Sequence, residues 1–178
     1  GRGGLVAISA GSGTSGVGGL VSILSGRSTV HTGGALSIES GEGTGTTSGI
    51  ITIRSTNSGA SGVSGSLVFS SGTAVKGNSG AIIVGTGAAT TGRGGLVAIS
   101  VGSGTSGVGG LVSMWAGKST TLAGGLVSIS GGVADVNTGG AVNLASGEGT
   151  ATTSGIITIR STNSGASGVS GSLVFSSG

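Results

Sequence analysis

A repeat of about fifteen residues, opened each time by a Gly-Gly or Ser-Gly pair, runs through the whole chain. A short fixed period is typical of architectures in which one repeat cannot bury a core and is stable only against its neighbours. We number each repeat from the first residue of its pair. The repeats then start at residues 3, 18, 33, 48, 64, 79, 94, 109, 124, 139, 154 and 170, which makes twelve.

Two longer repeats lie above this period. Residues 2–28 match residues 93–119 almost one for one, and residues 46–72 are identical to residues 152–178. The two offsets are 91 and 106, and one inserted repeat of fifteen residues, 124–138, accounts for the difference. The short repeat is therefore the segment that is gained or lost. We expect one continuous array over residues 1–178, with longer repeats at 3–93 and 94–178.

Inside each repeat, glycine and apolar residues hold fixed positions. Position 2 is always glycine, which indicates either a positive φ or a backbone approach too close for a Cβ. Positions 4 and 6 are always apolar, as in Val112 and Met114, and this alternation is typical of a half-buried strand. Two repeats have sixteen residues, and we place their extra residue at Thr56 and Thr162, where it would form a bulge. Position 9 is then always Gly or Asn, the residues that tolerate positive φ.

These positions predict the fold class, an all-β parallel β-solenoid of twelve stacked, two-sided repeats of 15 to 16 residues. Two turns in each repeat leave room for two short strands, and the second strand should carry position 12. Position 12 is mostly small, and its side chains should face the Val/Ile ladder. They are Thr14, Thr29, Thr44, Ala60, Val75, Thr90, Thr105, Thr120, Asp135, Thr150 and Ala166. Neighbouring repeats would stack about 4.8 Å apart.

Composition narrows the function classes. With 45 glycines among 178 residues, any core must be thin, while the regular Val and Ile argue against disorder. The absence of cysteine rules out a disulfide framework and leaves the compartment open, and no apolar run approaches a membrane span. Seven scattered cations and almost no aromatic residues do not make a nucleic-acid footprint. The chain begins without Met or a signal sequence, so we expect a segment of a longer protein.

One motif resembles a phosphate cradle. Residues 11–16 and their copy, residues 102–107, fit G-x-G-x-x-G. In a dinucleotide-binding unit a helix follows this motif, and an acidic residue about twenty positions later holds the ribose. Here the pattern predicts a strand instead, and no such acidic residue is present. We therefore expect no cofactor.

The few acidic residues have plain structural uses. In stacked repeats Glu39 would lie beside Arg54, and Glu42 beside Arg27, as surface ion pairs worth about 0–1 kcal/mol. The second copy lacks both arrangements, so these pairs are optional. A glycosidase would need a matched pair of carboxylates. Because each glutamate is expected to pair with an arginine, the sequence does not favour a glycosidase.

The remaining unusual residues stand alone. His31 is the only histidine, so neither a catalytic triad nor a metal site can be assembled, and a solvated turn residue is expected. Asp135 is the only aspartate, which excludes calcium-binding repeats, and it indicates a local register shift. Trp115 is a candidate interface residue on the outward face. We expect no catalytic, cofactor or metal site, and hence no enzyme.

The units G-G-x-V-x-I-S-x-G and S-G-I-I-T-I-R-S-T-N-S-G-A-S-G-V-S-G-S-L-V-F-S-S-G carry a resemblance. Over essentially the whole chain they are similar to the Gly/Ser/Thr-rich tandem-repeat β-solenoid proteins of diatoms and related algae. The resemblance implies a secreted protein of the cell surface or extracellular matrix. It carries over no catalytic residues.

The expected function is that of a structural protein, an extracellular fibre, filament or surface coat. Its partner would be the chain itself, joined end to end or laterally, because neither end has the polar cap of a monomeric solenoid. A polysaccharide matrix is a further candidate partner, and exposed Ser and Thr could carry O-glycans. Two alternatives stay open. One is carbohydrate adhesion or ice binding on a flat Ser/Thr face, and ice binding would require a more regular Thr column. The other is a viral or phage fibre shaft, which a trimeric mass would distinguish.

Overall fold

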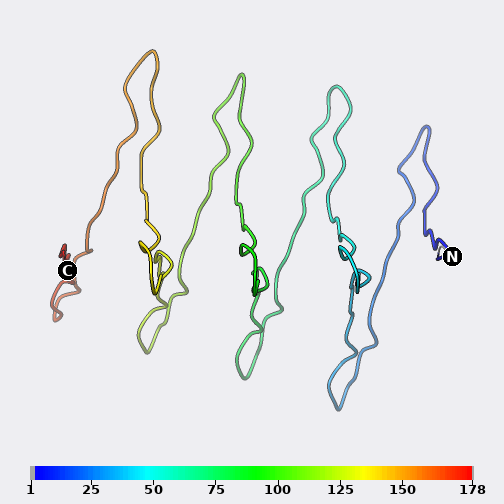
Figure 1. The fold of residues 1–178 in the computed structure, drawn as a ribbon, viewed down its shortest axis with the longest axis horizontal. Helices are drawn as coiled ribbons and strands as arrows, with labels where there is room; N and C mark the ends of the chain where they lie inside the picture. Colours follow the sequence, from blue (N-terminus) through cyan, green and yellow to red (C-terminus); the bar gives the residue numbers. More distant parts are fainter. Residues whose placement is uncertain (1–2, 178) are drawn as a thin grey trace. The chain divides into compact units, whose positions relative to one another are not determined.

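The computed structural model describes residues 3–177, and over that range it contains neither helix nor strand. It divides into two units, Gly1–Thr86 and Gly87–Gly178. In both parts the chain runs out and back in narrow loops joined by extended segments (Figure 1). The predicted β-solenoid, with its stacked strands and its 4.8 Å layers, is therefore wrong. No helix within this range is long and apolar enough to cross a membrane.

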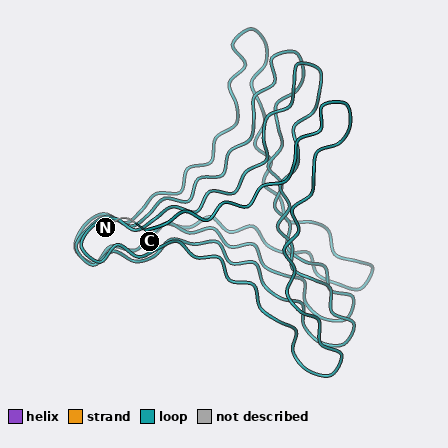
Figure 2. Cartoon of the chain, turned by 90° about the vertical axis from the view of Figure 1, so that its right-hand side faces the viewer, coloured by secondary structure: helices purple, strands orange, loops and turns teal. Residues whose placement is uncertain are grey.

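The recurring local element is a loop of nine residues. The backbone N–H of the position-2 glycine donates to the carbonyl of position 9 in the preceding repeat, at 2.8–3.0 Å. Bonds of this kind join Gly19 to Gly11, Gly34 to Gly26, Gly49 to Gly41, Gly110 to Gly102, Gly125 to Gly117, Gly140 to Gly132 and Gly155 to Gly147. Figure 2 shows the resulting loops and the extended segments between them.

Each of these loops bends at its tip, the bend begins at position 12, and the chain bends in the same way at residues 75–77 and 90–92. The bends span residues 14–16, 29–31, 44–46, 75–77, 90–92, 105–107, 120–122, 135–137 and 150–152. The structure thus repeats with the same period as the sequence. The prediction that position 12 lies on a second strand facing the ladder is wrong. Small polar residues flanked by glycine suit a bend at least as well as a strand, because their side chains bond to nearby backbone groups.

Position 11 shapes these bends in two ways. Where it is serine, the hydroxyl closes the tip: Ser119 Oγ accepts from the N–H of Leu122 at 2.9 Å, and Ser28 Oγ accepts from the N–H of His31 at 2.8 Å. Where it is glycine, the backbone folds too tightly for a side chain. A Cβ on Gly104 would lie 2.6 Å from the carbonyl oxygen of Gly107.

The two sixteen-residue repeats close their loops differently. A turn at residues 60–61 joins Gly62 N–H to Gly59 O at 3.4 Å, and the second copy repeats it between Gly168 and Gly165 at 3.2 Å. In that copy Ser164 Oγ also donates to Gly168 O at 2.6 Å. The strand bulge predicted at the extra residue is wrong, since the described chain has no strand there; the extra residue accompanies a change of turn.

At some of the position-2 glycines a Cβ would crowd the preceding repeat, whereas a Cβ on Gly80 would make only an ordinary contact of 3.7 Å. A Cβ on Gly110 would lie 2.9 Å from Val101 Cβ, and one on Gly19 would lie 2.9 Å from Ala10 Cβ. Within residues 3–177 only Gly77 has a positive φ, at 125°. The positive φ expected at position 9 is therefore wrong. That residue contributes its carbonyl to loop closure instead.

Between the loops, positions 3–8 form extended segments with no core beneath them. No hydrophobic side chain of the described residues is buried. The chain exposes 17522 Å², whereas a folded monomer of 16.1 kDa exposes about 7,400 Å² and its unfolded chain about 23,000 Å². The isolated chain thus lies nearer to the unfolded value than to the folded one.

Candidate functional site

The alternation in the sequence persists as an alternation in exposure along the extended segments. Val112 at position 4 is 47% exposed and Met114 at position 6 is 65% exposed, while Leu111 and Trp115 beside them are 83% and 92% exposed. The same order recurs in the neighbouring repeats. We call the side chains at positions 4 and 6 of all repeats the 4/6 stripe. It is the one apolar feature that every repeat contributes.

The extended segments also leave backbone groups without partners. Residues 20–25 and 111–116 make no hydrogen bond that pairs them with another segment of the described chain. Their N–H and C=O groups are open to solvent or to a second chain. An alternating apolar segment with unpaired backbone groups is a surface that other chains can join.

Two surface recesses lie at equivalent places in the two copies of the longer repeat. One is lined by Arg54, Ser55, Thr56 and Asn57, with a volume of about 330 Å³. The other is lined by the matching residues, 160–163, and has a volume of about 220 Å³. We call them the Arg-Ser-Thr-Asn recesses. No carboxylate lines either one.

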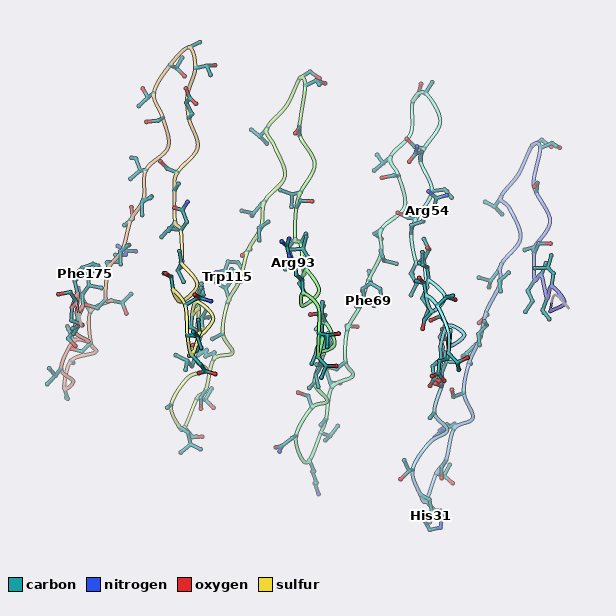
Figure 3. All side chains as sticks on the ribbon, in the orientation of Figure 1. His31, Arg54, Phe69, Arg93, Trp115 and Phe175 are labelled. Carbon is teal, nitrogen blue, oxygen red and sulfur yellow. The ribbon has the colours of Figure 1, made fainter. Side chains whose placement is uncertain are left out.

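The arginine of each recess has no acidic partner. The stacked pair predicted between Glu39 and Arg54 is wrong, because the described residues contain no such ion pair and Glu39 instead accepts a hydrogen bond from Ser37 Oγ at 2.7 Å. The predicted pairing of Glu42 with Arg27 fails in the same way. Both pairs required stacked repeats, which the chain does not form. Figure 3 shows Arg54 on an extended segment.

The G-x-G-x-x-G segments lie in the loops just described. Residues 11–16 include the bend at 14–16, and the Gly11 carbonyl accepts from Gly19 N–H at 2.8 Å. A Cβ on Gly13 would lie 2.5 Å from the Gly16 carbonyl oxygen, so this glycine serves the tightness of the loop. An extended segment follows, not a helix. The glycines of this motif are thus explained by loop geometry.

The isolated residues that the sequence singled out, His31, Trp115 and Asp135, do not come together. His31 lies at the outer end of its loop and Trp115 stands free on an extended segment (Figure 3). Asp135 opens the bend at residues 135–137, at position 12 like its equivalents. Within the described range, no three His, Cys, Asp or Glu residues gather as a metal site would require.

No family model, curated protein or solved structure matches the chain. The 4/6 stripe could be read directly from the sequence, whereas the recesses could not. One sequence pattern could have indicated the recesses. The extra residue, the arginine at position 7 and the asparagine at position 9 occur together, and only in the two sixteen-residue repeats.

Proposed function

We propose that this chain is a structural protein that assembles with copies of itself into a fibre, filament or surface coat. The observation that carries the proposal is the exposure of every large apolar side chain among the described residues. A soluble monomer rarely exposes large apolar patches. The number of exposed apolar side chains in this chain therefore favours association with a partner. Since the same stripe recurs in every repeat, a second copy of the chain is the partner whose surface matches it.

The recurrence favours assembly because the contributions add along the chain. Full burial of a Val, Ile, Leu, Phe or Met side chain stabilises by about 1.5–3 kcal/mol. Each repeat contributes two such side chains at positions 4 and 6. Pairing between chains would at the same time satisfy the open backbone groups of the extended segments, whose burial without partners would be costly.

Sparse charge removes the usual obstacle to such association. Charged residues make up 6% of the chain and its net charge is +3, so repulsion between copies is weak. Cations and anions both lie outside positions 4 and 6. The stripe can therefore be buried without burying a charge. The resemblance to algal repeat proteins favours an extracellular location for the assembly.

The test removes the stripe from one repeat. Replacing Val112 and Met114 with serine should raise the concentration at which assemblies form by at least about tenfold, the factor that corresponds to 1.4 kcal/mol. The measurement is light scattering over a dilution series. The matched control is Leu24→Ser with Leu111→Ser. Leu24 lies at position 7, which other repeats fill with Glu39 or Arg54, and Leu111 lies at position 3, which other repeats fill with Ser66 or Ser172, so neither column forms a continuous apolar surface.

The control pair should shift the onset of assembly much less than the stripe pair. Equal shifts would show that hydrophobicity alone, without the stripe, drives association. No shift with the stripe pair would remove the 4/6 stripe as the interface.

A further inference from the structure

The Arg-Ser-Thr-Asn recesses carry an inference that does not depend on self-assembly. They are the places where three departures from the regular repeat coincide: an added residue, an arginine in the extended segment and asparagine in place of the position-9 glycine. A surface recess lies at each of these two places. The sequence around them is identical over residues 46–72 and 152–178, so the chain presents the same site twice.

The lining residues are chemically suited to an oxyanion. The guanidinium of Arg54 is a planar, permanently charged group whose donors match the geometry of sulfate or carboxylate oxygens. Ser55 and Thr56 add hydroxyl donors, and Asn57 adds an amide donor. The arginine has no carboxylate partner in the described chain, so its charge is available to a ligand. The volumes, about 330 and 220 Å³, lie at or below the lower end of the range for drug-sized ligands, so each recess suits a small group.

We propose that each recess binds one oxyanion group of an acidic polysaccharide, a sulfate ester or a carboxylate. A polymer is favoured over a free anion because the site occurs twice in one chain, and a polymer with repeated anions can occupy both, which raises the overall affinity without new contacts. Nucleic acid is disfavoured, because no aromatic residue that could stack a base lines either recess.

The experiment compares two double variants that lose the same charge. Arg54→Gln with Arg160→Gln empties both recesses of their cation, while Lys76→Gln with Lys118→Gln removes two cations that line neither. Binding to dextran sulfate, with neutral dextran as the blank, is measured by titration calorimetry at constant ionic strength. The recess variant should bind about fivefold more weakly for each site lost, the upper range for an exposed ion pair. The lysine variant should lose less than twofold.

A second measurement on the unaltered chain separates the sources of the anion. Sodium sulfate and dextran sulfate are each titrated while the side-chain N–H signals of Arg54, Asn57 and their copies are followed by NMR. The proposal expects both ligands to move the same signals, with dextran sulfate acting at a lower concentration of sulfate groups. Equal losses in the two double variants, unmoved recess signals, or binding of inorganic sulfate that dextran sulfate does not displace would each overturn it.

Discussion

Replacing Gly110 with alanine should open the loop between residues 102 and 110, whereas replacing the adjacent Gly109 should leave it closed. The added Cβ at Gly110 would lie 2.9 Å from Val101 Cβ and 3.4 Å from the Gly102 carbonyl oxygen. A Cβ at Gly109 would meet nothing within 4 Å. The two variants change the same number of atoms and restrict the backbone alike, so they differ only in this contact.

The magnitude follows from the hydrogen bond that the contact would break. Gly110 N–H donates to Gly102 O at 3.0 Å. A bond of this kind contributes about 0.5–1.5 kcal/mol net, which corresponds to about a two- to thirteenfold change in the population of the closed loop. Because the loop is exposed and has no packed core behind it, we expect a value toward the lower end.

Amide hydrogen exchange at residue 110, normalised by the intrinsic rate of each variant, measures that population. Exchange at residue 110 should accelerate two- to thirteenfold in Gly110→Ala and stay within error of the unaltered chain in Gly109→Ala. Gly49→Ala offers a graded comparison, since Gly49 N–H closes an equivalent loop to Gly41 O at 2.9 Å and its Cβ would meet Ser40 Cβ at 3.3 Å. Equal exchange in the Gly110 and Gly109 variants would refute the role assigned to position 2.

Two further expectations follow from the same geometry. Ser119→Ala removes the hydroxyl that accepts from Leu122 N–H at 2.9 Å, so amide exchange at Leu122 should rise about two- to thirteenfold. The control Ser113→Ala, on the extended segment, should leave exchange at Leu122 unchanged. Equal exchange in the two variants would contradict the role of Ser119 in the bend. The circular dichroism of the dilute chain should show neither helix nor strand bands, and a strong strand spectrum that persists on dilution would contradict the described fold.

The period of the local structure could be predicted from the sequence because glycine acts locally. In most repeats the second glycine of the opening pair is a loop-closing donor, and the alternation at positions 4 and 6 recurs as lower exposure, as at Val112 against Leu111. Both properties depend only on residues within one repeat and its neighbour. Close approach, one of the two reasons expected for glycine at position 2, applies at Gly19 and Gly110 but not at Gly80.

The strands could not be predicted safely, because alternation indicates an extended backbone but not the segment that pairs with it. The bonds between repeats join glycine to glycine, as in Gly110 and Gly102, and bring no apolar segments into register. The ion pair of Glu39 with Arg54 rested on that register and failed with it. The recesses were missed because arginine, serine, threonine and asparagine in succession look like an ordinary polar loop.

In the proposed assembly the chain buries its apolar side chains against copies of itself. Sedimentation equilibrium of the purified 16.1 kDa chain over a hundredfold range of concentration tests it most directly. If the 4/6 stripe is the interface, the average mass should rise steadily with concentration, and Val112→Ser with Met114→Ser should shift that rise to higher concentration. A mass that stays at 16.1 kDa over the whole range would contradict it.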